Sequence, residues 1–161
     1  MNAYTVLQDH HTVLKGLVRR VSEIQPTAAE RQNYLDDLLV ELDIHFRIED
    51  DLFYPALAEA GSLIAVAHAE HRQVIDQLSV LLRTPPTAAR YEDEWRSFAT
   101  VLEAHADEEE RDMIPAPAPV RISEAELVAL GDKMAARIEQ LRDSTVHKLR
   151  VKGRKALLRT I

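Results

Sequence analysis

Two copies of one short pattern decide the fold of this chain. The first copy reads His45-Phe46-Arg47-Ile48-Glu49-Asp50-Asp51-Leu52-Phe53-Tyr54-Pro55, and the second covers residues 105–115 in the same register. In each copy a glutamate follows the histidine by four residues, a second acid by five, and a proline by ten. Residues four apart on a helix lie one turn apart on the same face. Each copy therefore presents an imidazole beside a carboxylate, which suits metal ions that take nitrogen and oxygen ligands.

The repeat extends to the segment before each copy. Residues 9–17 and 70–78 both read acid, histidine, two spacers, valine, an aliphatic residue, two spacers and leucine. The distance from His10 to His45 is 35 residues, and that from His71 to His105 is 34. The chain therefore reads as one helix-pair unit used twice.

Composition sets the class of protein. A chain of 161 residues with 46% hydrophobic residues is predicted to form one domain with a core. The absence of cysteine excludes disulfides and thiolate metal sites. A net charge of −7 argues against a nucleic-acid partner. We see no signal peptide and no apolar run long enough for a membrane span, so we expect a cytoplasmic protein.

Apolar periodicity and turn residues predict an all-α protein whose four long helices form an up-down-up-down four-helix bundle. The expected helices cover residues 3–24, 28–55, 62–83 and 88–114. Thr27 and Glu30 resemble a capping box at the start of the second helix. Gly61 is expected to stop the turn after Pro55, and Thr87 to cap the fourth helix.

The C-terminal part is predicted to lie outside the bundle, so we divide the chain into residues 1–119 and 120–161. The proline-rich connector 115–119 cannot be helical. Ser123 and Glu126 then form a second capping box, which opens an additional C-terminal helix that runs to about residue 145. Its apolar stripe needs a partner, either this bundle or a copy of the chain in a homo-oligomer. The stripe consists of Leu127, Leu130, Met134, Ile138 and Leu141.

The tail after Asp143 contains no acid and carries six basic residues. We interpret it as a solvated, partly frayed helix end that balances an acidic body. The alternative interpretation is an interaction tail for an unknown partner.

The metal interpretation depends on which side chains face the bundle interior. On a helical wheel His10 lies within the stripe of Leu7, Leu14, Leu17 and Val21, whereas His11 lies at its edge. The match with His71 in the repeat also selects His10. We therefore predict His10 as a ligand and give His11 a surface role or a supporting one.

The carboxylates four residues after each histidine share its face, so Glu49 and Glu109 are the predicted ligands. Asp50 and Glu110 are rotated by about 100° and are expected to orient an imidazole or face solvent. His68 is interpreted as a flanking residue and His147 as unrelated to the site. The predicted metal ligands are His10, His45, Glu49, His71, His105 and Glu109. Two such pairs in register are poorly explained by packing, because buried imidazoles and carboxylates are costly without partners.

This pattern resembles the haemerythrin and HHE cation-binding domains, which have His, His-x-x-x-Glu, His and His-x-x-x-Glu on four helices. The resemblance covers about residues 3–115. It implies two non-haem iron ions with an oxo or hydroxo bridge. His10 and His45 would hold one side with Glu49, while His71 and His105 would hold the other with Glu109.

The chain differs from the oxygen-carrying members at two positions. Ala67 stands four residues before His71, where those proteins have a histidine, and Glu110 stands where they have an aspartate. The four-histidine, two-glutamate set is closer to di-iron proteins that handle nitric oxide or repair iron centres, which carry an additional cysteine-bearing domain.

The resemblance implies a di-iron protein that binds or reacts with O₂, NO or peroxide. The alternatives are a di-iron enzyme that decomposes peroxide or reduces NO, and an iron store or buffer. The sequence leaves open whether turnover occurs.

Overall fold

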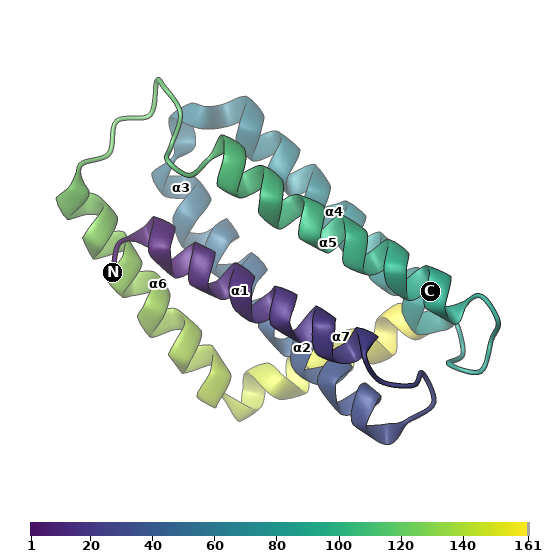
Figure 1. Cartoon of the computed structure of the whole chain (residues 1–161). Helices are drawn as coiled ribbons and strands as arrows, with labels where there is room; N and C mark the ends of the chain where they lie inside the picture. The colour runs from purple at the N-terminus through teal and green to yellow at the C-terminus, as the bar shows by residue number, and fades with distance from the viewer. Residues whose placement is uncertain (161) are drawn as a thin grey trace.

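The computed structural model describes residues 1–160, and that part of the chain contains helices and no strand. Four long helices run up, down, up and down, which confirms the predicted all-α bundle (Figure 1). They are α1 (Ala3–Ser22), α2 (Ala29–Ile48), α4 (Gly61–Arg83) and α5 (Tyr91–Asp112). No single described helix is both long and apolar enough to cross a bilayer; the segments Ala29–Ala56 and Ala58–Arg83 meet that criterion only as a pair bent by 95°.

Two apolar clusters fill the bundle, one toward each end. The first surrounds Trp95 and Phe98 of α5, and the second surrounds Phe53 and Leu57 after α2. In α1 the buried apolar side chains of residues 14–21 belong to the first cluster, and those of residues 3–7 belong to the second. His10 and His11 lie between these two segments, so a polar layer separates the two apolar clusters.

The second helix widens where the repeated pattern begins. α2 continues directly into a π-helical turn, Glu49–Phe53, and then into the short helix α3, Tyr54–Ala56. The N–H of Tyr54 donates to the carbonyl of Glu49, five residues back. Residues five apart on an α-helix are about 140° apart around the axis. The wider turn brings Tyr54 back toward the face of Glu49, and such turns are frequent at functional sites.

Two of the predicted helix caps and one predicted stop signal are wrong. α2 starts after Ala28 without a side-chain cap, so the capping box predicted at Thr27 does not form. α5 starts after Arg90 rather than at Thr87, because the chain first makes two backbone turns, Ala88 N–H to Pro85 O and Tyr91 N–H to Ala88 O. Gly61 begins α4 instead of ending a helix, since a 3₁₀ turn, Ala58–Ala60, leads into it.

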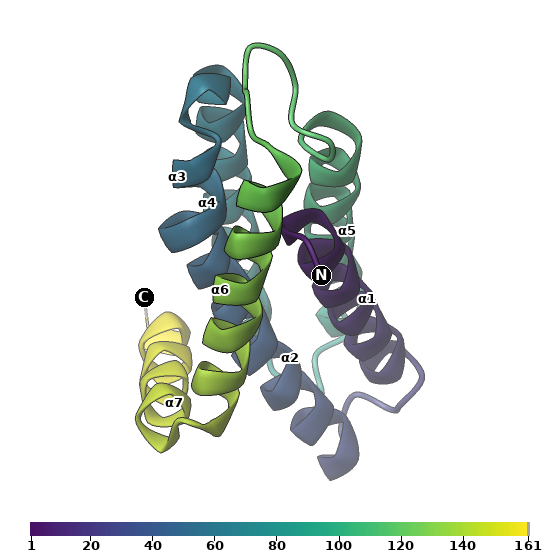
Figure 2. The same cartoon turned by 90° about the vertical axis from the view of Figure 1, so that its left-hand side faces the viewer.

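The predicted helix after the proline-rich connector is present as α6, Glu124–Asp143, and the capping box of Ser123 and Glu126 is confirmed. α6 packs along α1 and α2 of its own chain (Figure 2). Its buried side chains are Leu127, Met134, Ile138 and Leu141. The apolar stripe is therefore covered within one chain and needs no second copy for that purpose.

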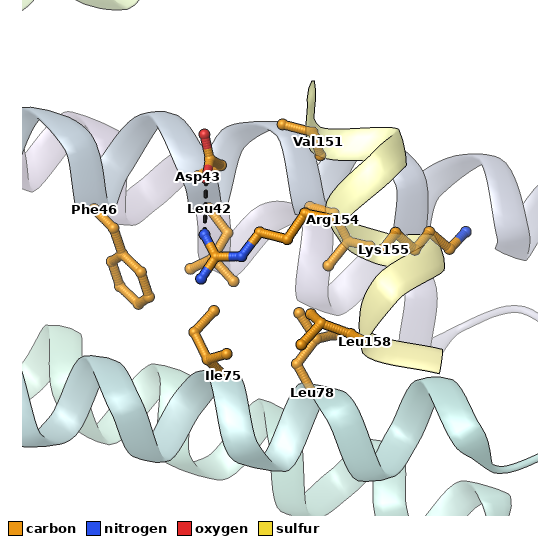
Figure 3. Close-up of a pocket in the computed structure, with 10 residues that line it drawn as sticks. Leu42, Asp43, Phe46, Ile75, Leu78, Val151, Arg154, Lys155 and Leu158 are labelled. Carbon is orange, nitrogen blue, oxygen red and sulfur yellow. Dashed lines mark hydrogen bonds and ion pairs between the residues drawn. The ribbon is translucent and has the colours of Figure 1, made fainter. Parts of the chain in front are cut away.

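The basic tail is not the frayed helix end that the sequence predicted. The chain turns at Ser144 and forms a further helix, α7 (Thr145–Thr160), so two helices follow the bundle rather than one. α7 packs across α2 and α4. Val151 and Leu158 point toward α2 and α4, and Arg154 reaches Asp43 across a cavity of about 30 Å³ (Figure 3). The acids of α2 and this apolar contact hold the tail against the bundle.

Gly131 of α6 lies directly against the backbone at the start of α1. A Cβ atom built on Gly131 would lie 2.3 Å from the carbonyl oxygen of Met1 and 2.8 Å from the nitrogen of Ala3. We expect Gly131→Ala to lower the free energy of unfolding by about 1–3 kcal/mol, because backbone cannot move aside as a side chain can. Chemical denaturation followed by circular dichroism measures this change.

Gly153→Ala provides the matched control, since a Cβ at Gly153 of α7 meets nothing within 4 Å. There the gain in helix propensity should raise the free energy of unfolding by up to about 1 kcal/mol. Equal effects of the two substitutions would contradict the close packing of α6 on α1.

Candidate metal centre

The polar layer between the two apolar clusters consists of histidines and glutamates contributed by α1, α2, the π turn, α4 and α5. Each side chain in it is buried. The members are His10, His11, His45, Glu49, His71, His105 and Glu109. The structure thus brings all six predicted ligands into one region and adds His11.

Within this layer the ligand atoms form two groups. One group consists of His11, His45, Glu49 and Glu109, and the other of Glu49, His71 and His105; within each, the atoms lie within 4.8 Å of one another. Glu49 belongs to both: its Oε1 is 2.7 Å from His45 Nε2, and its Oε2 is 2.8 Å from His71 Nε2. A carboxylate placed between two sets of imidazoles suits a bridge between two metal ions.

The inner atoms of these groups are buried without a hydrogen-bond partner in residues 1–160. They are the Nε2 atoms of His11, His45 and His105, both oxygens of Glu49, and Oε1 of Glu109. The pair His45 Nε2 and Glu49 Oε1 is close, at 2.7 Å, but is not aligned for a hydrogen bond. Buried polar atoms without partners are costly. Their convergence fits cations that accept nitrogen and oxygen ligands, such as iron, manganese or zinc.

Carboxylates outside the two groups hold three of the imidazole rings. The Nδ1 atoms concerned lie 2.7 Å from Glu110 for His11, 2.7 Å from Glu70 for His105, and 3.3 Å from Asp50 for His71. A carboxylate that accepts from Nδ1–H fixes the ring so that Nε2 faces inward. Asp50 and Glu110 thus make the orienting contacts that the sequence suggested. Glu70 was missed, although it precedes His71 directly in the repeat.

The surface position, the first of the two roles predicted for His11, is wrong. His11 is 1% exposed, and its Nε2 lies 3.6 Å from Glu109 Oε1. His10 is also buried, but it stands behind His45 and outside both groups. Its Nδ1 is 3.0 Å from His45 Nδ1, and its Nε2 is 2.7 Å from Glu41 Oε2.

The error on α1 has a physical cause. α6 covers one side of α1 and the bundle covers another, so the apolar stripe is wider than the side that faces the bundle interior. The half-buried Leu17 misled the helical wheel, while Val18 is buried. The spacing Leu7, His11, Leu14, Val18, with steps of four, three and four, places His11 in the centre of the inward face.

Tyr54 is a side chain of the buried site that the sequence did not place. Its hydroxyl donates to Glu109 Oε2 at 2.7 Å and lies 3.3 Å from His71 Nε2. Burial and the nearby Glu49 and Glu109 carboxylates raise the pKa of Tyr54 well above its usual range. The phenol therefore stays protonated as a hydrogen-bond donor inside the site.

The surroundings of the site lower the pKa of some of its groups and raise the pKa of others. It lowers the pKa of His45 to about 3, so that this imidazole is neutral. Burial also lowers the pKa of His105, but the Glu49 carboxylate 3.6 Å away and the hydrogen-bonded Glu70 outweigh it and raise the pKa to about 10. Burial and the charge of Glu49 raise the pKa of Glu109. A cation that enters the site replaces protons shared among these groups.

The chain is similar to a known protein family and to proteins of two mycobacteria. Residues 2–116 match the family described as Hemerythrin HHE cation binding domain. The chain belongs to this family. Uncharacterized protein Rv2633c of Mycobacterium tuberculosis and uncharacterized protein Mb2666c of Mycobacterium bovis are each 65% identical to it over 161 residues, which is 100% of both chains.

A solved structure has the same fold. It is the crystal structure of a hemerythrin HHE cation binding domain-containing protein from Mycobacterium kansasii, described as an Rv2633c homolog. It is 68% identical, with a TM-score of 0.92 over 100% of this chain and 99% of that chain. The similarity extends past residue 116, so α6 and α7 belong to the shared fold of this HHE subgroup.

The HHE site approaches the surface at His71. This histidine is 7% exposed, more than the other members of the two groups, and its ring stacks on Phe46 with centroids 3.9 Å apart. It lies at a depression of about 430 Å³ lined by charged residues that include Asp50 and Arg72. The partly exposed His68 lies 3.3 Å from Asp50 and flanks the site, as predicted. His147 lies apart, with its Nε2 2.7 Å from Asp43.

Proposed function

We propose that this protein holds two non-haem iron ions in its bundle and binds or reacts with O₂, NO or peroxide. The observation that carries the proposal is the pair of buried donor groups that share Glu49. His11, His45 and Glu109 would hold one ion, and His71 and His105 the other, with Glu49 between them. Membership of a cation-binding family and the doubled sequence pattern support the same assignment.

Two adjacent iron ions, when bound, supply redox chemistry for a small molecule. The chain itself supplies burial, which excludes bulk water, and the hydroxyl of Tyr54, which can donate to a group between Glu109 and His71. The approach beside His71 is narrow, because only 7% of that residue is exposed. These features favour a diatomic molecule or peroxide over a larger metabolite.

An iron store is the weaker alternative, because the buried ligand atoms form two groups with a shared carboxylate, which suits two ions rather than many. A di-iron enzyme that decomposes peroxide or reduces NO is the stronger one, since Tyr54 places a proton-bearing oxygen within 3.3 Å of a ligand nitrogen. Binding and enzymatic turnover differ in the number of molecules that each site consumes.

Iron loading and spectroscopy test the proposal. Protein loaded with ferrous iron under anaerobic conditions should contain about two irons per chain by elemental analysis, as two donor groups predict. Addition of O₂, NO or peroxide should then produce new near-ultraviolet and visible bands. Continuous consumption of peroxide or NO would identify an enzyme, whereas one equivalent per site would identify a binding protein. Fully helical protein that retains no iron would overturn the proposal.

A further inference from the structure

His45 differs from the other inward-facing imidazoles in what holds its ring. The rings of His11, His71 and His105 have a carboxylate at Nδ1. The Nδ1 of His45 instead lies 3.0 Å from the Nδ1 of His10. A second histidine at this position can hold the ring only if its own proton is on the other nitrogen.

The contacts of His10 decide where its proton lies. His10 Nε2 is 2.7 Å from Glu41 Oε2, and a carboxylate only accepts, so His10 donates from Nε2. The Nδ1 of His10 is then an acceptor and receives the Nδ1–H of His45. With its proton on Nδ1, His45 turns an unprotonated Nε2 toward Glu49 and the interior. The position of one proton on His10 therefore fixes the tautomer of His45.

Arg142 of α6 holds the outer end of this chain of contacts. Its Nε donates to Glu41 Oε1 at 2.8 Å, and one terminal nitrogen donates to Glu41 Oε2 at 3.0 Å. Two donors from one planar guanidinium fix the orientation of the carboxylate as well as its charge. Burial raises the pKa of Glu41, but hydrogen bonds from His10 and Arg142 outweigh it and lower the pKa to about 2.

We propose that Arg142 is a positioning residue for the metal centre, which acts through Glu41 and His10 to hold His45 in the tautomer that presents Nε2 to a metal. This inference rests on the proposed function to the extent that His45 binds the ion. It gives α6, which follows the matched family domain at residues 2–116, a direct part in the site. His10 and His45 are both buried, so water does not substitute for the contacts between them.

The rival explanation is that Arg142 only ties α6 to α2. Both explanations predict a lower melting temperature for Arg142→Ala. They differ in what happens to the ring of His45 in folded protein, well below the melting temperature. His105 is the internal reference, because Glu70 of α4 holds its Nδ1 independently of Arg142.

Zinc is the probe, since it is diamagnetic and accepts the same nitrogen and oxygen ligands. The full chain, labelled with ¹⁵N-histidine and loaded with zinc, is compared with Arg142→Ala and Arg142→Lys. Arg137→Ala is the matched control, because Arg137 lies on the same helix and donates to Gln140 instead. Two quantities are measured: the solvent exchange of each imidazole Nδ1–H by NMR, and the rate of zinc release to excess chelator.

In Arg142→Ala the Nδ1–H of His45 should exchange faster while that of His105 is unchanged, and zinc release should be about 10-fold faster, the lower range for loss of an outer contact to a ligand. Arg142→Lys should restore part of the effect, because it keeps the charge but not the two-pronged geometry. Arg137→Ala should match the wild type.

Each other outcome overturns the inference in a distinguishable way. If wild-type protein binds zinc and Arg142→Ala releases it at the wild-type rate with an unchanged His45 signal, Arg142 is only a structural tie. If His45 and His105 change together, the effect is a general loosening of the fold. If wild-type protein binds neither zinc nor iron, the proposed function itself fails.

Discussion

Replacement of His11 by alanine is expected to reduce the bound iron from about two ions per chain to about one, because one of the two donor groups loses an imidazole that no neighbour replaces. His11 Nε2 is one of the buried atoms without a hydrogen-bond partner in residues 1–160. Its ring is already held by Glu110 at Nδ1, at 2.7 Å. Iron content by elemental analysis, on protein of unchanged helicity, measures the loss.

His10→Ala is the paired substitution one residue away on the same helix. His10 lies outside both donor groups, so this variant should still bind about two ions while releasing one of them about 10-fold faster, as expected when an outer contact to a ligand is lost. If His10→Ala loses an ion and His11→Ala retains both, α1 is rotated relative to the structure described above.

Replacement of Glu49 by alanine is expected to have the largest effect, the loss of both metal ions. Glu49 is the one residue shared by the two fully buried donor groups in the described part of the chain. Its two oxygens face different imidazoles, His45 at 2.7 Å and His71 at 2.8 Å. Glu109→Ala should lose less, since Glu109 belongs to one group and its Oε2 accepts from Tyr54. The iron content and the visible absorption bands of the iron-loaded protein measure the loss of metal in both variants.

Melting temperatures measured with and without metal distinguish a variant that cannot bind metal from one that does not fold. Removal of a buried carboxylate should leave metal-free Glu49→Ala folded, because burying such a charge is itself costly. Metal should raise the melting temperature of the wild type but not of Glu49→Ala, since a metal ion stabilises the folded state only of a protein that binds it. Asp51→Ala, an exposed neighbour in the same π turn, should behave as the wild type. A metal-dependent rise in Glu49→Ala would contradict the shared role of Glu49.

Local periodicity in the sequence was sufficient for the features that depend on neighbours along one helix. His45 with Glu49, and His105 with Glu109, share a face because four residues make about one helical turn. The same reasoning predicted the four long helices and the capping box of Ser123 and Glu126. The doubled pattern also indicated the haemerythrin-like family.

Boundaries and the tail depended on contacts that a linear pattern does not contain. The caps predicted at Thr27 and Thr87 do not form, because the chain makes backbone-hydrogen-bonded turns before each of these helices. The basic tail became α7 because Asp36 and Asp43, more than a hundred residues earlier, face Lys155 and Arg154. Ion pairs and apolar contacts over that separation in sequence exist only where the fold places α7 beside α2 and α4.

The sequence by itself determined the four long helices and five of the residues that line the centre, because these follow from the periodicity of a single helix and from the repetition of one helix-pair pattern along the chain. The tertiary structure alone decided that His11 rather than His10 faces the ligand groups, since the second neighbour of α1, helix α6, shifts its apolar stripe. It alone decided the place of Tyr54, because a π turn rotates the helix after Glu49. It also brought Arg142 to Glu41 across 101 residues, a contact that exists only when α6 lies on α2.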